Sequence, residues 1–248
     1  MEKKIYFASD VHLGFPNYRE GRTRELRFAA WLDSIENDVE ELYLLGDIFD
    51  FWFEYKKVVP RGFTRIIGRL ASLSDRGIPI HFFVGNHDLW LTDYLLTEVG
   101  VIIHREPYEI IRNGRSFYLA HGDGLGSGDH GYKLLKKIFT NRTLRWLYAG
   151  LHPNFALKLA HLWSKNSRYS KGLIAEEFNP YSDILFNYAK DLEKKQHHDY
   201  YIFGHRHRPL DLQIPESGAH FINLGDWLTH FTYASFNGEK LTLHKFEI

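Results

Sequence analysis

The sequence contains no cysteine, has no net charge and has no long hydrophobic run. The absence of cysteine excludes disulfide bonds, thiolate metal sites and a thiol nucleophile. The 31 basic and 31 acidic side chains balance, which excludes a globally basic nucleic-acid-binding protein. No run approaches the roughly 18 apolar residues of a membrane span, and the start lacks a signal peptide, so we expect a cytoplasmic protein. We expect no nucleic-acid partner and no obligate protein partner.

Histidine and aromatic residues are abundant in the remaining composition. The 248 residues include 15 His, 19 Phe, 15 Tyr and 6 Trp. The excess of histidine suggests metal binding or acid–base chemistry, because imidazole binds metals and titrates near neutral pH. The length suits one large α/β domain with a sizeable core, so we predict a single domain over residues 1–248.

Apolar strands alternate with helical patterns along the chain, which predicts an α/β fold. In the first half we expect strands at residues 4–8, 41–45, 78–84 and 115–120, and helices at residues 20–39, 63–74 and 88–99. In the second half we expect a helix over residues 179–195 and strands at residues 200–203, 210–214, 219–224, 231–236 and 240–246. Asn113-Gly114 is a typical hairpin turn before one of these strands.

Polar side chains follow several of these strands at the point where each strand ends. Asp10, Asp47, Asn86 and His121 all occupy such positions. In open α/β sheets, binding sites gather at the carboxyl ends of the strands. We therefore expect these four side chains to lie close together although they are far apart in the sequence. Asp226, at a later strand end, is predicted either to close one wall of the site or simply to end its strand.

Five short motifs supply the side chains that can carry chemistry. They are Asp10-Val11-His12, Gly46-Asp47-Ile48-Phe49-Asp50, Gly85-Asn86-His87-Asp88, Ala120-His121-Gly122-Asp123 and Gly204-His205-Arg206-His207. Carboxylate, imidazole and amide ligands without thiolate suit Mn²⁺, Fe²⁺ or Zn²⁺ in a hydrolytic centre. Any one motif is a weak signal, whereas the whole set in this order is not expected by chance.

This set resembles the calcineurin-like metallophosphoesterases, whose pattern is D-x-H, G-D-x-x-D, G-N-H-[DE], a later H and G-H-x-H. The resemblance implies a four-layer sandwich, in which two packed mixed β-sheets are flanked by helices. It also implies two divalent metal ions, which we expect to be Mn²⁺, with Fe²⁺ or Zn²⁺ as alternatives. The implied ligands are Asp10, His12 and His207 for one ion, Asn86, His121 and His205 for the other, and Asp47 as the bridge.

His87 and Asp50 are the candidate catalytic residues. His87 follows the expected ligand Asn86 and should face the substrate, where it could stabilise transition-state charge or protonate the leaving oxygen. Asp50 or Asp88 could orient its imidazole. The alternatives are a hydrogen-bonded turn histidine at position 87 and a capping or packing role for Asp50.

Residues 125–171 differ from the rest of the chain. They contain nine basic residues and one acidic residue, a net charge of +8 that the remaining chain balances with −8. Apolar residues are interleaved with these charges, so we predict a helical insert whose second half starts at Pro153. It could pack on the core with a solvated basic face. It could instead be a lid that admits acyl chains and docks on an anionic membrane, with an apolar surface from Trp146, Tyr148, Phe155 and Trp163.

The chain contains the stretches His121-Gly122-Asp123-Gly124-Leu125 and Asp129-His130-Gly131-Tyr132, and Asn166-Ser167 followed by basic residues at the end of the insert. In these stretches it resembles the UDP-2,3-diacylglucosamine hydrolases of lipid A biosynthesis. This resemblance implies cleavage of that glycolipid's diphosphate to lipid X and UMP, at the inner face of the cytoplasmic membrane. The implied headgroup contacts are Asp129, Tyr132, Asn166, Ser167, Arg168 and Lys171. Two positions depart from that group, which has arginine where this chain has His87 and Ser164. A soluble phosphodiesterase or phosphatase for nucleotides or small phosphoesters, and a scaffold without catalysis, remain alternatives.

Overall fold

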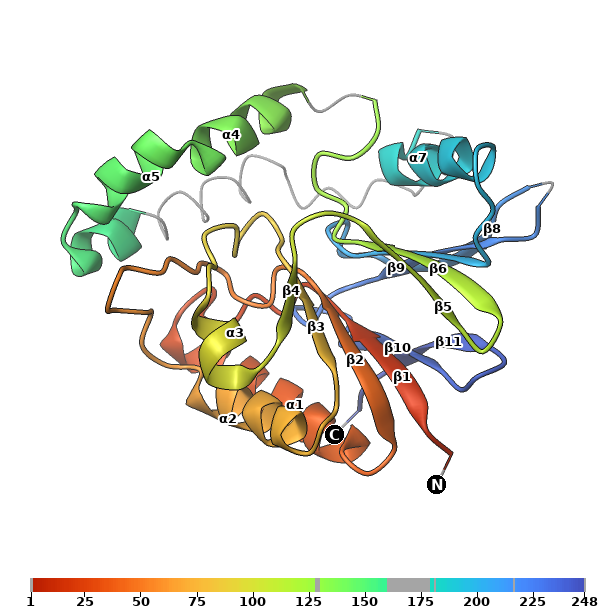
Figure 1. Ribbon diagram of the computed structural model, residues 1–248, viewed down its shortest axis with the longest axis horizontal. Helices are drawn as coiled ribbons and strands as arrows, with labels where there is room; N and C mark the ends of the chain where they lie inside the picture. Colours follow the sequence, from red (N-terminus) through yellow and green to blue (C-terminus); the bar gives the residue numbers. More distant parts are fainter. Residues whose placement is uncertain (1, 128–129, 160–178, 181, 216, 248) are drawn as a thin grey trace.

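Two mixed β-sheets pack face to face, with helices on their outer sides (Figure 1). This computed structural model describes residues 2–127, 130–159, 179–180, 182–215 and 217–247. The arrangement confirms the predicted four-layer α/β sandwich.

The first sheet has the strand order β11-β10-β1-β2-β3-β4. Strands β1 to β4 run parallel to one another, β10 pairs antiparallel with β1, and β11 pairs antiparallel with β10 at the edge. Its strands are β1 (Lys4–Ala8), β2 (Val39–Leu45), β3 (Ile80–Phe83), β4 (Ile102–His104), β10 (Thr232–Phe236) and β11 (Leu241–Lys245).

The second sheet has the strand order β5-β6-β7-β9-β8. Its centre is parallel, and the β5–β6 hairpin turns at Asn113-Gly114, as predicted. Its strands are β5 (Tyr108–Arg112), β6 (Arg115–Ala120), β7 (Tyr200–Phe203), β8 (Pro209–Gln213) and β9 (His220–Leu224).

The alternation of side chains along β1 shows how the layers form. Ile5 and Phe7 point between the two sheets, whereas Tyr6 and Ala8 pack beneath the helices on the outer face. Successive strand residues face opposite sides, so a strand that is apolar on both sides is buried by two layers.

The helices cover the two outer faces unequally. On the first sheet lie α1 (Tyr18–Ile35), α2 (Thr64–Asp75) and α3 (Tyr94–Val99), and on the second lies α7 (Ile184–Glu193). The described part of the insert contributes α4 (His130–Thr140), α5 (Arg142–Ala149) and helical residues 153–159. The helix at 153–159 begins at the predicted Pro153, but the bounds of the insert at 125–171 stay a prediction. None of the described helices is both long and apolar enough to cross a membrane.

Several elements differ from the predictions. The helix predicted over residues 88–99 is helical only from Tyr94, where the backbone N–H groups of Asp93 and Tyr94 donate to the Glu54 carboxylate. The helix predicted over residues 179–195 begins at Ile184, where the Asp183 side chain caps the backbone N–H of Phe186. The helix predicted over residues 20–39 ends at Ile35, and Val39 already belongs to β2. Strands β4 and β5 were not among the expected strands, and the three residues of β4 carry too little periodicity to be recognised.

Candidate metal centre

The loops that follow five parallel strands bring the seven candidate ligands together. Strand β1 leads to Asp10 and His12, β2 to Asp47, β3 to Asn86, β6 to His121, and β7 to His205 and His207. This convergence at the carboxyl ends of the strands is the one that the sequence predicts. Their role as metal ligands stays a prediction.

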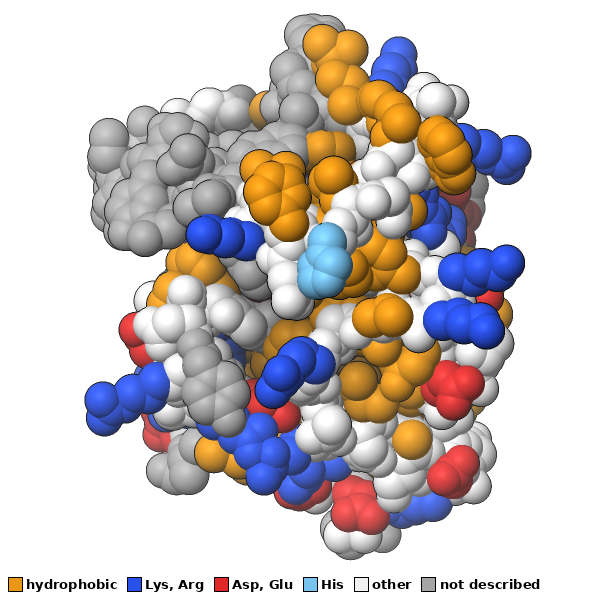
Figure 2. Space-filling model, turned by 90° about the vertical axis from the view of Figure 1, so that its left-hand side faces the viewer, with side chains coloured by type: hydrophobic (Ala, Val, Ile, Leu, Met, Phe, Trp, Pro, Cys, Tyr) orange, Lys and Arg blue, Asp and Glu red, His pale blue; other side chains and the backbone are white. Residues whose placement is uncertain are grey.

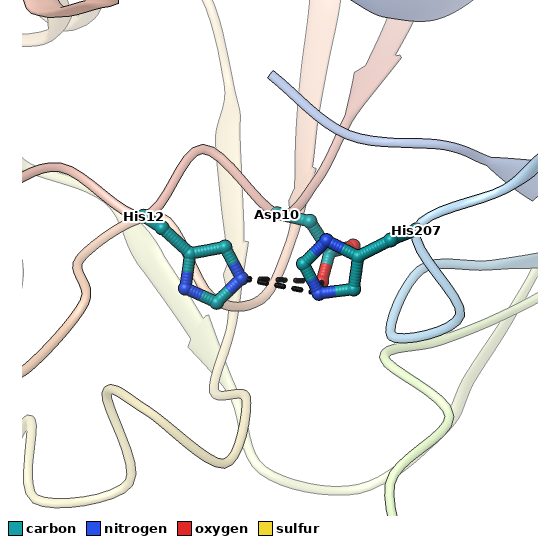
Figure 3. A group of neighbouring side chains, drawn as sticks. All are labelled: Asp10, His12 and His207. Carbon is teal, nitrogen blue, oxygen red and sulfur yellow. Dashed lines mark hydrogen bonds and ion pairs between the residues drawn. The ribbon is translucent and has the colours of Figure 1, made fainter. Parts of the chain in front are cut away.

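Asp10, His12 and His207 form the first compact group (Figure 3). The Nε2 atoms of His12 and His207 lie 3.3 Å apart. Asp10 Oδ1 lies 3.4 Å from Nε2 of His207 and 3.8 Å from Nε2 of His12. Three atoms that can each offer a lone pair therefore face one point, which is the arrangement of a metal site.

Asp47, His121 and His205 form the second compact group. Oδ1 of Asn86 lies 3.3 Å from Nε2 of His121, so the amide belongs to this group as well. Asp47 Oδ2 is 3.4 Å from Nε2 of His121 and 3.8 Å from Nε2 of His12. The Asp47 carboxylate thus lies between the two groups, in the position of a bridging ligand.

Hydrogen bonds outside the site orient the imidazole of His121. Its Nδ1 lies 2.7 Å from the carbonyl oxygen of Leu45, which can only accept a hydrogen bond. Nδ1 therefore carries a proton, and Nε2 faces the oxygens of Asn86 and Asp47. Such an outer hydrogen bond is the usual device that orients a metal-binding histidine.

Asp10 provides the test of whether these residues fit a cation. Its Oδ1 is buried and accepts no hydrogen bond. A buried carboxylate oxygen without a partner is costly, and a bound cation would remove that cost. The donor set and this unpartnered oxygen together fit a pair of divalent ions.

The backbone at the candidate ligands is strained. Asp10, His12, Asp47, His205 and His207 all have positive φ values, although none of them is glycine. Such residues are uncommon and persist where the surrounding structure enforces them, often at functional sites.

Gly46 and Gly204 leave no room for a side chain, because candidate ligands lie too close to them. At Gly46, where φ is +85°, a Cβ would lie 2.5 Å from Nδ1 of His121. At Gly204, a Cβ would lie 2.5 Å from Oδ2 of Asp10. Any side chain at either position would displace a candidate ligand.

The electrostatics of the group favour a cation. Burial by itself would raise the pKa of Asp47, but the imidazoles of His121 and His87 hold that pKa well below its usual range. Burial likewise opposes a charge on His121, yet the Asp47 carboxylate raises the pKa of His121 well above its ordinary value. The attraction that would hold a proton on His121 would also hold a metal ion. Burial lowers the pKa of His205 to about 3, so this imidazole is a neutral candidate ligand.

His87 lies at the edge of this group and contacts Asp50. Its Nδ1 is 2.9 Å from the backbone carbonyl oxygen of Asp50 and 3.7 Å from that residue's Oδ1. The same Oδ1 is 3.5 Å from Nδ1 of His12, so one buried carboxylate lies between two imidazoles.

Asp88, the other residue considered for orienting His87, bonds to backbone groups of two ligand loops. Its carboxylate accepts hydrogen bonds from the backbone N–H groups of Gly85, at 2.7 Å, and Ile48, at 3.0 Å. Asp88 therefore fastens together the ligand loops that follow β2 and β3.

The predicted headgroup contacts belong to the predicted insert at residues 125–171. Tyr132 lies in α4, but its side chain is outside the described residues. Asp129, Asn166, Ser167, Arg168 and Lys171, together with Ser164, also lie outside the described residues.

The described part of the insert packs on an aromatic cluster next to the site. The Trp90 ring lies 4.8 Å from that of Tyr148 and 5.3 Å from that of Phe139, measured between ring centroids. Trp90 Nε1 also donates to the carbonyl oxygen of Phe139 at 2.6 Å. Tyr148 was expected on the apolar surface, but it is turned inward and its ring lies 4.8 Å from that of Phe53.

The outer face of the insert is apolar and basic. Trp146 and Phe155 are 73% and 59% exposed, as expected, whereas Trp163 lies outside the described residues. Figure 2 shows hydrophobic side chains gathered on this side of the molecule with basic side chains beside them. Other exposed apolar side chains of the insert are Leu134, Ile138, Leu144, Leu147 and Leu159.

Comparison with known proteins identifies relatives of the whole chain. The calcineurin-like phosphoesterase family matches residues 3–209. The UDP-2,3-diacylglucosamine hydrolase of Porphyromonas gingivalis is 42% identical over 260 residues, covering 100% of this chain and 99% of that protein. The enzyme of the same name from Aeromonas hydrophila is 29% identical, covering 89% of each chain. An archaeal phosphodiesterase structure is 14% identical with a TM-score of 0.47, covering 97% of this chain and 98% of that one.

Proposed function

Because this chain belongs to the calcineurin-like phosphoesterase family, we propose that it cleaves the diphosphate of UDP-2,3-diacylglucosamine to give UMP and lipid X. That it is a metal-dependent phosphoesterase follows from the family and from the candidate ligand groups. The choice of substrate rests mainly on the full-length similarity to a relative named UDP-2,3-diacylglucosamine hydrolase. An exposed apolar and basic insert beside the site fits a substrate that is both acylated and anionic.

The candidate ligands have separate tasks in this proposal. Asp10, His12 and His207 would hold one divalent ion, and Asn86, His121 and His205 the other, with Asp47 shared. The chemistry that two such ions supply is the activation of water and the neutralisation of phosphate charge. We place Mn²⁺ first because the donors are imidazole nitrogens and oxygens without a thiolate, with Fe²⁺ and Zn²⁺ as alternatives.

His87 would act as the general acid. The Asp50 carbonyl accepts a hydrogen bond from its Nδ1, which fixes the ring and leaves Nε2 as the other titratable nitrogen. The nearby Asp50 carboxylate stabilises the protonated form of the ring. A proton held at Nε2 can then pass to the leaving phosphate oxygen.

The insert would bind the acyl chains and the membrane surface. Its apolar side chains include the exposed Trp146 and Phe155, and its basic residues would face anionic headgroups. Each CH₂ group removed from water contributes about 0.8 kcal/mol, so acyl chains of ordinary length would dominate binding of the substrate. The proposal therefore includes peripheral association of the protein with the inner face of the cytoplasmic membrane.

One residue favours a second candidate function. The chain has His87 where the lipid A pathway group was expected to have arginine, and histidine is the residue of the wider family pattern. A soluble phosphodiesterase for nucleotides or other small phosphoesters would need no acyl chains.

Turnover of acylated and deacylated substrate separates the two functions. We would measure UMP release by the purified Mn²⁺-loaded protein from UDP-2,3-diacylglucosamine and from UDP-glucosamine, and release of the phenol from a generic aryl phosphodiester. The proposal expects efficient release only from the acylated substrate, and Asp47→Asn as a matched control should abolish it. Equal efficiency on UDP-glucosamine would contradict the lipid substrate, and efficient turnover of the aryl ester alone would favour the second function.

A further inference from the structure

We propose that Asp226 is a positioning residue that determines which nitrogen of His207 can bind metal, and that it thereby controls the affinity of one ion. This inference rests on the proposed metal-dependent function. It concerns a residue from the loop after β9, which supplies none of the candidate ligands.

The contact between the two side chains fixes the proton on His207. Nδ1 of His207 lies 3.3 Å from Oδ2 of Asp226 in a hydrogen bond. An ionised carboxylate can only accept, so Nδ1 must be the donor and must carry the proton. The lone pair of a neutral ring is then on Nε2, the atom that faces Asp10 and His12.

Asp226 is held rigidly enough to impose this orientation. The side chain is buried, and Oδ1 accepts hydrogen bonds from the backbone N–H groups of Thr229, at 2.8 Å, and His230, at 2.9 Å. The backbone N–H of Trp227 donates to the carbonyl oxygen of Asp10 at 3.1 Å. The loop that carries Asp226 is therefore attached directly to another residue of the same ligand group.

The two carboxylate oxygens of Asp226 have different tasks. Oδ1 accepts the backbone hydrogen bonds of the turn that follows, whereas Oδ2 faces the imidazole of His207 and also accepts from the Thr229 hydroxyl at 3.1 Å. An asparagine could still cap the turn with its single oxygen, but it would then present an N–H group to Nδ1 of His207. Nδ1 would have to accept, and the proton would move to Nε2, where it blocks metal binding.

The effect should be confined to one of the two ions. His207 belongs to the group with Asp10 and His12, whereas the other group contains His121 and His205. Loss of such an outer partner typically lowers metal affinity by about 10-fold to 100-fold. We therefore expect Asp226→Asn to bind one Mn²⁺ normally and the other more weakly.

Counting bound Mn²⁺ in Asp226→Asn tests this inference without using activity. Electron paramagnetic resonance of free Mn²⁺ during titration gives the number of bound ions and their dissociation constants. Asp211→Asn is a matched control, because Asp211 also accepts from a histidine, at 2.7 Å from Nδ1 of His220, but lies outside the site. We expect weakening of one ion in Asp226→Asn and none in Asp211→Asn.

The outcomes distinguish this inference from the proposed function. Two equally tight ions in both wild type and Asp226→Asn would overturn the role of Asp226 alone. Failure of the wild type to bind any Mn²⁺, Fe²⁺ or Zn²⁺ would overturn the metal-dependent function with it.

A second measurement needs no variant of Asp226. The ¹⁵N chemical shifts of histidine in Zn²⁺-loaded wild type report which ring nitrogen carries a proton, and His207→Gln assigns the signal. A proton on Nδ1 of His207 supports the inference, and a proton on Nε2 excludes it.

Discussion

The imidazole of His87 and the backbone carbonyl of Asp50 lie 2.9 Å apart, so the ring is held by a residue of the neighbouring ligand loop. The backbone N–H of His87 donates in turn to Oδ1 of Asp47, at 2.8 Å. The candidate acid and the candidate bridging ligand are thus parts of one hydrogen-bonded unit. This connection makes it necessary to separate loss of proton transfer from loss of metal in any variant.

His87→Ala should reduce kcat without removing metal. Loss of a general acid typically reduces the rate by about 10²-fold to 10⁴-fold. The backbone bond from residue 87 to Asp47 is kept in the variant, so the metal content should change little. Steady-state kinetics combined with elemental analysis tests both parts. An unchanged kcat with weakened metal binding would make His87 a ligand instead.

His87→Arg should keep appreciable activity if the lipid substrate is correct. The related lipid A pathway group was expected to have a cation at this position, and arginine can stabilise the same phosphate charge. The comparison is made with His87→Ala at equal metal loading. If arginine is no better than alanine, the chemistry of this chain depends on proton transfer from histidine.

Asp47→Ala should nearly abolish activity and lower the occupancy of both metals. Asp47 is the one candidate ligand placed between the two groups, and it follows the end of β2 in a loop. The variant should stay folded, which circular dichroism would check. Two tightly bound ions per chain in Asp47→Ala would show that this carboxylate is not the bridge.

Arg206→Ala should weaken the binding of both ions slightly. Arg206 lies between His205 and His207, and its guanidinium donates to Asp183 at 2.8 and 3.0 Å. Because the side chain is half exposed, the pair should contribute about 1 kcal/mol or less, which is at most about fivefold in affinity. Competition with a chelator measures the effect.

Two further variants serve as controls for Arg206→Ala. Asp183→Asn keeps an N-cap for α7 while removing the charge, so it should weaken metal binding to the same extent. Arg69 in α2 donates two hydrogen bonds to Asp33 in α1, far along the chain from the candidate ligands of the β7 loop. Arg69→Ala removes this ion pair and should leave metal affinity unchanged. An equal effect of Arg69→Ala would mean that the loss is general destabilisation.

Trp146→Ser and Phe155→Ser should weaken binding to anionic vesicles and raise KM for the acylated substrate. Both residues are exposed on the insert, and neither belongs to the candidate metal centre. Ile111→Ser is a matched control, because Ile111 is 69% exposed on β5. Flotation with phosphatidylglycerol vesicles measures binding, and high salt should weaken it further by screening. Unchanged flotation of both insert variants would argue against membrane docking.

The buried His81 should make the protein less stable as the pH falls. Its ring stacks on Tyr43, and its Nδ1 lies 2.8 Å from Nε2 of His104. Burial and the nearby His104 lower the pKa of His81 to about 4, and Glu41 and Arg112 modify it in opposite directions. An unfolded histidine has a pKa of about 6.5. Between about pH 6.5 and about pH 4, the imidazole of residue 81 is protonated in the unfolded state but not in the folded state. The free energy of unfolding therefore falls as the pH is lowered through this range.

His81→Phe should remove this part of the pH dependence. From about pH 7 to about pH 5, the wild type should lose about 2 kcal/mol more unfolding free energy than the variant. Urea denaturation at the two pH values measures the difference. His197→Phe, at an exposed site, should behave like the wild type. Parallel losses in wild type and His81→Phe would show that another group controls the acid transition.

The sequence by itself determined most of the strands and, through its resemblance to a known family, the expected layers and candidate ligands. Short continuous apolar runs predicted most of the strands, because a strand buried on both faces needs apolar side chains on both. The polar residues that follow Ala8, Leu45 and Ala120 were predicted to meet, because parallel strands end at the same edge of a sheet. These signals are local, so they can be read without knowledge of any contact.

Only the tertiary structure decided how the candidate ligands are supported. Asp226 contacts His207 across 19 positions of the sequence, and Asp183 contacts Arg206 across 23. Asp88 fastens two loops where an orienting role for His87 was considered, and Tyr148 is half-buried against Trp90 where exposure was expected. Each of these roles depends on which distant side chain comes within hydrogen-bonding or packing distance. Residue type and local spacing carry no information about that distance.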